Sequence, residues 1–345
     1  MKRLSAIVIF LLVTLIISTI YFVFAPATSF SERSRSFVIE KGKNNKEALV
    51  RLLQEKEIVK YEWAFELLGN QFNIWSKLKL GKFEVKKNEN LLGIVRMIRN
   101  NKQAQVKLII NKFRTKEEFS KLIEKNFSTD SITAIRFFSS NDSLSFFNID
   151  SNNVASIIIP NTYSFYWGTP LNKIIGRLQS ESDDFWEKEN RREKAKSLGF
   201  KPQEIITIAS IVEEETNMNA DKGKIASVYM NRLQKGMNLS ADPTIKFALK
   251  NFSLKRILFQ HLSVESPFNT YKNKGLPPGP ICTPSVSTID AVLNAPATSY
   301  LYFVAKPDFS GYSNFSSNFA EHSQYAKQYQ QALNVYLTKK QSDQK

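Results

Sequence analysis

The residues best suited to chemistry lie in one short apolar segment, residues 205–216, which reads IITIASIVEEET. Its apolar residues recur at the i, i+3 and i+4 spacing of a buried helical face, and the i+7 position of that series is Glu215. Burial disfavours the charged form of a carboxyl group and raises its pKa, as a general acid near neutral pH requires. Glu215 is therefore predicted to be a catalytic acid. The apolar positions of the series are Ile208, Ile211 and Val212.

The two neighbouring glutamates fall elsewhere on the same helix. At about 100° per residue, Glu213 lies at the edge of the apolar face and Glu214 lies on the far side. Glu213 is thus the nearer candidate for a second carboxylate that contacts the substrate. The alternative is a helix that ends near residue 213, with the three glutamates in a solvated acidic turn. Periodicity alone does not separate the two interpretations.

A second amphipathic stretch, residues 224–235, ends at Gly236, a typical helix stop. Asp242, Pro243 and Thr244 follow, which is typical of an N-cap with proline at the first helical position. The polar side chains near the acidic helix are candidates to bind a ligand, and the alternative is a set of surface residues and a helix cap. These candidates are Asn231, Arg232, Asp242 and Thr244.

Residues 266–284 read SPFNTYKNKGLPPGPICTP, with five prolines, two glycines and two aromatic rings. Such a segment cannot form regular structure, and it is too apolar for a solvated linker. We expect an ordered loop that lines a cleft, where a stiff backbone and exposed aromatic faces suit sugar rings.

The remaining pattern predicts an α+β fold. A strand, two helices and a strand over roughly residues 37–85 are expected, with Asn44 as the N-cap of the first helix and Glu47 as its capping-box partner. This order is that of a small LysM-like βααβ module, and a generic spacer is the alternative. The other expected strands are 105–110, 156–159 and 300–305, and the other expected helices are 90–98, 116–123, 287–293 and 319–337.

The N-terminus predicts a membrane anchor. Leu4 to Ala25 are 22 uncharged residues, enough to span a hydrocarbon core of about 30 Å. The stretch is longer than the apolar part of a signal peptide, and Pro26 spoils a cleavage site there, so a cleaved signal is the less favoured alternative. We expect the rest of the chain to lie outside the cytoplasm.

Composition narrows the class of protein further. The 345 residues carry a net charge of +16, which suggests an anionic partner, but the expected compartment argues against nucleic acid. The single cysteine, Cys282, and the two histidines make a metal site unlikely, and we expect no metal and no cofactor.

Several long blocks of the sequence resemble the MltG/YceG-like endolytic murein transglycosylases. IASIVEEET, KIASVYMNRLQKGMNLSADPT, SPFNTYKNKGLPPGPI, LYFVAKPD and the closing NFAEH occur in the order of that family. The resemblance implies an enzyme that cleaves the MurNAc-β-1,4-GlcNAc bond within nascent peptidoglycan strands and leaves 1,6-anhydro-MurNAc ends. It implies Glu215 as acid and then base, because a glutamate followed by a small hydroxyl residue matches Glu215-Thr216.

The resemblance also implies a substrate-binding set and partners. Asn269 and Tyr271 match the family's NTY motif and are expected beside Glu215 in the glycan cleft, with Asn269 bonded to an acetamido group. Penicillin-binding proteins are the implied partners, and the cytoplasmic membrane is the implied location, with the catalytic domain on the periplasmic or extracytoplasmic side. The alternative is a non-catalytic peptidoglycan-binding scaffold for cell-wall synthases.

The sequence departs from the family pattern in three places. Asn111-Lys112 stands where relatives tend to have Glu-Gly, Asn161 stands where they have Asp, and Ser313 stands where they have His. None of these positions is Glu215. The expected organisation is a tip and transmembrane helix at 1–30, a LysM-like module with its connecting helix at 36–110, and a catalytic domain at 111–340.

Overall fold

The chain has a mixed helix and strand (α+β) fold. The computed structural model describes residues 2–342 and divides into two compact units. Unit 1 comprises Met1–Leu108, Glu124–Asp130 and Ser164–Pro170, and unit 2 comprises Ile109–Ile123, Ser131–Tyr163 and Leu171–Lys345.

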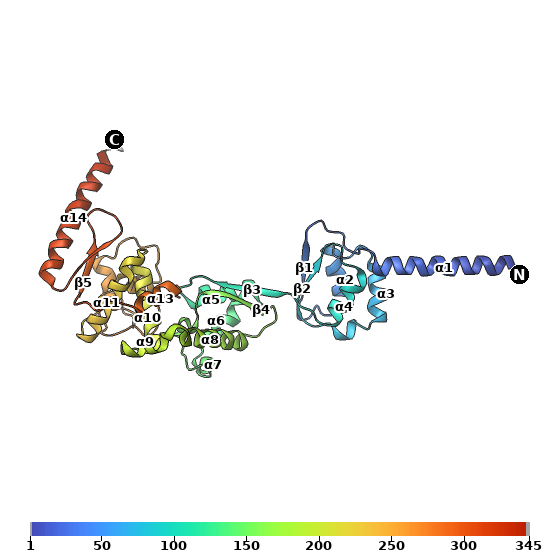
Figure 1. Ribbon diagram of the computed structural model, residues 1–345, viewed down its shortest axis with the longest axis horizontal. Coiled ribbons are helices and arrows are strands. Elements are labelled where there is room, and N and C mark those ends of the chain that lie inside the picture. The colour runs from blue at the N-terminus through green and yellow to red at the C-terminus, as the bar shows by residue number, and fades with distance from the viewer. Residues whose placement is uncertain (1, 343–345) are drawn as a thin grey trace. The chain divides into compact units, whose positions relative to one another are not determined.

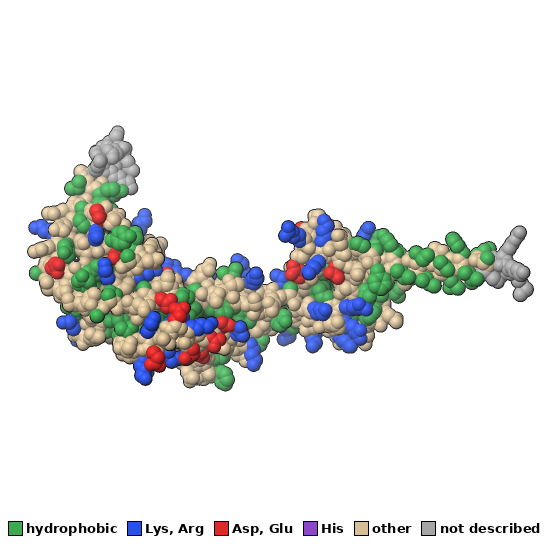
Figure 2. Space-filling view, viewed as in Figure 1, with side chains coloured by type: hydrophobic (Ala, Val, Ile, Leu, Met, Phe, Trp, Pro, Cys, Tyr) green, Lys and Arg blue, Asp and Glu red, His purple; other side chains and the backbone are tan. Residues whose placement is uncertain are grey.

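The first element is α1 (Lys2–Phe24), a single long helix (Figure 1). Most of its described apolar side chains are exposed (Figure 2). Within it, Ala6–Phe24 is long and apolar enough to cross a membrane. A signal sequence near the N-terminus has the same length and composition. Around the end of α1, the ring of Phe22 contacts Tyr61 and Trp63 edge to face.

Unit 1 contains the expected order of strand, helix, helix and strand. The two strands pair antiparallel, with Phe37 opposite Phe83 and their rings stacked 5.4 Å apart at the centre of the apolar core. Figure 2 shows Lys and Arg side chains over the visible face of this unit. Its elements are β1 (Ser34–Ile39), α2 (Lys46–Glu55), α3 (Glu62–Gln71), β2 (Gly81–Lys86) and α4 (Leu91–Arg99).

The prediction that Asn44 caps the first helix of unit 1 is wrong by one residue. Asn45 is the N-cap of α2, and its Oδ1 accepts a hydrogen bond of 2.9 Å from the backbone N–H of Ala48. Either asparagine has the right side chain. Asn45 has the extended backbone that an N-cap needs, with φ −121° and ψ 172°.

A second sheet pairs β3 (Gln105–Ile110) with β4 (Asn161–Tyr166). The strand predicted over 156–159 is wrong, because residues 154–157 form a 3₁₀ turn in which the N–H of Ser156 donates to the carbonyl of Asn153. The isoleucines that suggested a strand are buried against the neighbouring core. The strand begins only after Pro160, which has no N–H to donate to a ladder.

The core of unit 2 is built around α10 (Pro202–Glu215), which packs against α11 (Asn219–Gln234), α12 (Asp242–Ala248) and α13 (Val286–Leu293). All eight residues from 205 to 212 are buried. The helix is therefore central, with neighbours on every side, rather than amphipathic at the surface. It continues through all three glutamates, which contradicts the solvated acidic turn.

A small C-terminal layer covers one end of this core. β5 (Tyr302–Ala305) and β6 (Ser313–Ser316) form an antiparallel pair, and α14 (Phe319–Ser342) packs beside them (Figure 1). The strand predicted at 300–305 is shorter and only partly buried, because its sheet has two strands. The remaining helices are α5 (Lys116–Asn126), α6 (Ser131–Ser139), α7 (Asn141–Ser145), α8 (Leu171–Glu187) and α9 (Arg191–Ser197).

Residues 266–284 form the expected ordered loop. They contain no helix or strand, yet much of the segment is buried. The loop is tied to the segment after β3, because Phe113 and Thr283 exchange two hydrogen bonds of 3.0 and 3.1 Å.

Candidate active site

The three consecutive glutamates at the end of α10 point in three directions and have different partners. This follows from the rotation of about 100° per residue along a helix. Glu215 is the last residue of α10, and Thr216 is its C-cap. Glu215 lines an open pocket that Glu213 and Glu214 do not line.

Glu215 has the electrostatics of a general acid. Its Oε1 accepts a hydrogen bond of 2.6 Å from the phenol of Tyr229 on α11. Desolvation by the surrounding protein raises the pKa of Glu215 to about 7, although the Tyr229 hydrogen bond acts in the opposite direction, and the negative charge of Asp242 adds to the rise. Near neutral pH the carboxyl group therefore populates both protonation states, as proton transfer requires.

Glu213 is held in a structural network. Its Oε2 accepts hydrogen bonds from Thr288 and from Ser285, the latter 2.9 Å long, and lies 3.3 Å from the ammonium of Lys222. Burial would raise the pKa of Glu213, but the Thr288 and Ser285 hydrogen bonds and the Lys222 charge outweigh it and hold the pKa below its usual value. The side chain joins α10 to α11 and α13, and it does not line the pocket of Glu215.

Glu214 pairs with two cations from the segment after β3. Its Oε1 lies 2.5 Å from Lys112, and its Oε2 accepts a hydrogen bond of 3.1 Å from Arg114. Burial acts to raise the pKa of Glu214, but these two partners leave it lowered. Lys112 is one of the positions at which the sequence departs from the family pattern, and here it anchors the end of α10.

The pocket of Glu215 has a volume of about 390 Å³. Arg232 lies in its wall, where Nε donates to the carbonyl of Leu301 at 2.7 Å and Nη1 donates to that of Leu239 at 2.6 Å. These bonds hold the guanidinium 5.3 Å from the ring of Tyr302. The pocket is lined by Glu215, Tyr229, Arg232, Leu239, Ser240, Asp242, Tyr271, Tyr302, Phe303, Phe319 and His322.

Asp242 and Tyr271 both line this pocket and contact each other. The Tyr271 hydroxyl donates to Oδ1 of Asp242 at 2.5 Å. Burial and the Asp242 carboxylate both raise the pKa of Tyr271, so the phenol remains a donor. The prediction that Asp242 is an N-cap is wrong, because Ala241 is the N-cap of α12 and Asp242 is its first residue. The Asp242 carboxylate is therefore left to face the pocket.

Besides Glu213 and Asn269, two predicted substrate contacts, Asn231 and Thr244, lie outside the lining of the pocket. The amide of Asn231 donates to the carbonyls of Thr298 and Tyr300, both at 2.9 Å. The hydroxyl of Thr244 is buried and donates to the carbonyl of Ala241 at 2.7 Å. Both side chains hold backbone in place.

Asn269 is the clearest difference from the prediction. It is fully buried, and its amide donates to the carbonyls of Leu262 and Val264 at 2.9 and 2.8 Å. Its Oδ1 accepts from the backbone N–H of Tyr271 at 3.0 Å. Because both amide hydrogens and the oxygen are occupied, Asn269 has no free donor for a sugar, and its role is to shape the turn that presents Tyr271.

Sequence reasoning missed three side chains of this pocket. Tyr229 lies in the amphipathic stretch 224–235, where periodicity indicates only an apolar helical position. Tyr302 and His322 come from the C-terminal layer, and their rings stack 5.1 Å apart. His322 has a buried Nδ1 with no hydrogen-bond partner, and burial together with the charge of Arg232 lowers its pKa. The closing NFAEH block, which contains His322, was the available signal.

The described residues contain no group of three or more His, Cys, Asp or Glu side chains placed to hold a metal ion. What the pocket offers is one carboxyl group with a pKa near neutral, a guanidinium, a second carboxylate and several aromatic rings. This arrangement defines a general acid–base site with aromatic walls of the kind that contact sugar rings.

The comparisons with known proteins agree with this class. The chain belongs to the YceG-like family, whose model matches residues 37–328. The crystal structure of a YceG-like protein from Listeria monocytogenes is similar, with a TM-score of 0.55 and 26% identity, over 85% of this chain and 99% of that one.

Curated relatives match about half of the chain. The endolytic murein transglycosylase of Bacillus subtilis is 37% identical over 173 residues, which are 50% of this chain and 47% of that protein. That of Streptococcus pneumoniae serotype 2 is 34% identical over 152 residues, which are 43% and 27% of the two chains. The chain thus spans about half the length of the first relative and about a quarter of the second.

Proposed function

We propose that this protein is an endolytic lytic transglycosylase that cleaves the MurNAc-β-1,4-GlcNAc bond within peptidoglycan strands and leaves 1,6-anhydro-MurNAc ends. The observation that carries the proposal is Glu215, a carboxyl group with a pKa of about 7 at the base of a ring-lined pocket. The names of the Bacillus and Streptococcus relatives support the same chemistry.

The geometry of Glu215 supports a single-carboxylate mechanism. Since Tyr229 donates to Oε1, the proton of the neutral acid resides on Oε2, where it can be given to the glycosidic oxygen. As the bond between C1 and that oxygen breaks, the GlcNAc fragment leaves with the proton. The Glu215 carboxylate then takes a proton from the C6 hydroxyl of MurNAc, whose oxygen forms the new bond to C1. No water is consumed, unlike in hydrolytic glycosidases with two carboxylates.

The other pocket residues are proposed to bind the sugars. Arg232 is fixed by two backbone carbonyls, so it offers its remaining N–H donors with little loss of side-chain freedom. Asp242 and Tyr271 offer hydrogen bonds, and Tyr302 offers a ring face. Asn231, Thr244 and Asn269 are proposed to act indirectly, through the backbone that they hold.

The location and the partners are further parts of the proposal. We infer that α1 is a single-pass anchor in the cytoplasmic membrane and that the catalytic domain lies on its outer side. The antiparallel strands of unit 1 with two helices between them support a LysM-like glycan-binding module. The boundaries 36–110 and 111–340 and the association with penicillin-binding proteins stay predictions.

The proposal is tested by identifying the ends that the reaction releases. Full-length protein in detergent is incubated with purified peptidoglycan, and the released ends are analysed by mass spectrometry. The proposal expects 1,6-anhydro-MurNAc ends from the middle of strands, and it expects their loss in Glu215→Gln. Reducing ends, or no cleavage of several peptidoglycans that the protein binds, would instead favour the hydrolase or the scaffold.

A further inference from the structure

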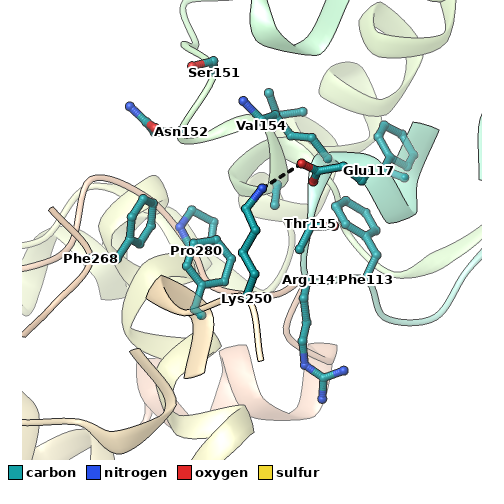
Figure 3. A pocket seen from close by; sticks show the side chains of 14 residues that line it. Phe113, Arg114, Thr115, Glu117, Ser151, Asn152, Val154, Lys250, Phe268 and Pro280 are labelled. Atoms are coloured by element: carbon teal, nitrogen blue, oxygen red, sulfur yellow. Dashed lines mark hydrogen bonds and ion pairs between the residues drawn. The ribbon is translucent and has the colours of Figure 1, made fainter. Parts of the chain in front are cut away.

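Unit 2 contains a second cavity, of about 200 Å³, which the acid–base chemistry does not use (Figure 3). Aromatic rings form part of its walls, where Phe113 and Phe119 stack 4.8 Å apart and Phe268 packs against Phe247 at 4.6 Å. Polar and charged side chains line the rest. Figure 3 shows Phe268 and Pro280 on one side and Phe113 on the other. At about 30 Å³ per water molecule, this space holds about seven waters, enough for one or two small residues.

The opening of this cavity carries amines. Lys250 reaches across it to Glu117, with 2.9 Å between Nζ and Oε1, and this ion pair is exposed. Lys116 also lines the cavity, and within residues 2–342 it has no ion pair. Partial burial lowers the pKa of Lys116. An amine in such surroundings gains most from a carboxylate ligand.

The backbone of Lys250 is strained in a way that points to function. Lys250 follows the C-cap of α12 and has φ +50°, a left-handed conformation that helices usually give to glycine or asparagine at this position. A lysine in this conformation makes the fold less stable than glycine or asparagine would. This backbone conformation nevertheless places the lysine side chain across the cavity.

The two pockets lie near opposite ends of one helix. The helix α12 begins with Asp242 in the first pocket and ends two residues before Lys250 in the second. Glu214, the neighbour of the acid, holds Arg114, whose side chain lines the second cavity. Seven residues of helix span about 10 Å, which about three residues of extended peptide cover.

We propose that this cavity binds the stem peptide of the murein strand being cleaved, with its small side chains against the phenylalanines and a free carboxylate on Lys250 and Lys116. The inference rests on the proposed function, because that function places the MurNAc sugar that bears the peptide at Glu215. It adds a substrate requirement, namely that the enzyme prefers strands whose peptides are present and acidic.

Binding is tested without cleavage. The probes are the tripeptide L-Ala-γ-D-Glu-L-Lys and its analogue with both carboxylates amidated, titrated into the full-length protein by calorimetry. We expect the acidic peptide to bind about tenfold more tightly, as a charge-assisted hydrogen bond would give. Equal affinity for the two peptides, or no binding of either, would overturn the proposal.

Two variants should change the affinity for the acidic peptide in opposite directions. Lys250→Asn should remove the preference for the acidic peptide without lowering the melting temperature, because asparagine accepts the left-handed backbone. Glu117→Gln should tighten acidic-peptide binding about threefold, since it removes the internal competitor for Lys250. The control is Lys196→Gln on α9, which removes one exposed positive charge elsewhere in unit 2 and should change nothing. Unchanged binding in Lys250→Asn would contradict the site.

A kinetic measurement separates this inference from the proposed function. The wild type is assayed on glycan strands with stem peptides and on strands stripped of them by an amidase. We expect kcat/KM to fall on stripped strands, and the ratio to approach one in Lys250→Asn. If the stripped strands are cleaved equally well, the stem-peptide site is wrong while the transglycosylase stands. If no strand yields anhydro ends, the proposed function fails, and the peptide titration still decides the site.

Discussion

Tyr229 on α11 and Glu215 at the end of α10 are joined by a hydrogen bond of 2.6 Å from the phenol to the carboxylate. Burial and the charge of Glu215 raise the pKa of Tyr229 well above its usual value, so the phenol keeps its proton. The bond orients the carboxyl group and lowers its pKa, against the larger effect of burial. Tyr229 is thus a positioning residue that sets the pH range of the acid.

Tyr229→Phe should shift the pH profile. The hydrogen bond to the charged carboxylate is lost, so the pKa of Glu215 rises further and the alkaline limb of kcat/KM moves to higher pH. We also expect a loss of about tenfold in kcat at neutral pH, because the acid is less well oriented. The measurement is kcat/KM from pH 5 to 9. An alkaline limb at the wild-type position would show that the bond does not tune Glu215.

Glu215→Gln should abolish anhydro-product formation by at least about 100-fold, the lower range for a general acid. The amide oxygen still accepts from Tyr229, so the fold should be kept. Glu214→Gln is the contrasting variant, and it should lose stability through its contacts with Lys112 and Arg114 rather than lose the chemistry. A greater fall of kcat in Glu214→Gln would refute the assignment of the acid.

Glu215→Gln should also alter how the free energy of unfolding depends on pH. The pKa of Glu215 is higher in the folded protein, at about 7, than the ordinary value of 4.5, so folding takes up a proton between these values. Its contribution to the free energy of unfolding is present below about pH 4.5 and is lost as the pH rises through 7. Glu215→Gln should therefore gain up to about 3 kcal/mol on the wild type between these limits. Denaturant unfolding at pH 5 and pH 8 measures this difference.

Asn269→Ala should lower stability and activity together. Truncation leaves the carbonyls of Leu262 and Val264 without their donor in a partly buried turn, at a cost of about 1 kcal/mol or more. If Asn269 instead bound an acetamido group, as the family resemblance implies, kcat/KM would fall at a constant melting temperature. Tyr271→Phe is the matched test of a pocket contact, because it removes only the bond to Asp242 and should raise KM with little change in stability. An unaltered melting temperature in Asn269→Ala would instead indicate that the Asn269 side chain contacts the substrate.

The anchor prediction concerns α1. If it remains uncleaved, the mature protein begins at or near Met1 and stays in the membrane pellet after a carbonate wash. N-terminal sequencing and fractionation check this together. A start just after Ala25, or release into the soluble fraction, would identify a signal peptide instead.

Local patterns were enough to predict several parts of the molecule. Periodicity and composition within a few turns of chain predict the apolar helix α1, the α+β class and the irregular loop at 266–284. They also predict that Glu215 is the desolvated one of the three glutamates. Helix rotation is a local property, so the direction of each glutamate was predictable. The family blocks carried the rest of the functional prediction.

Contacts between residues that are distant in sequence could be identified only from the tertiary structure. Lys112 and Arg114 reach Glu214 across about a hundred residues, and Thr288 reaches Glu213 across 75. These contacts distinguish two ion-paired glutamates with lowered pKa values from one desolvated glutamate with a raised pKa. No spacing rule contains that information, because a pKa depends on what surrounds the group in space.

The role of Asn269 also could not be predicted from the sequence. A polar residue in a stiff apolar loop is typical both of a ligand contact and of a turn, and its identity does not separate the two. The backbone carbonyls at positions 262 and 264 occupy its amide only because the folded chain brings them there. The sequence therefore determined which residue types were available to the site. The tertiary structure determined which of them keep a free donor or acceptor. Each side chain can make only a few hydrogen bonds, and buried backbone groups that need partners occupy some of them.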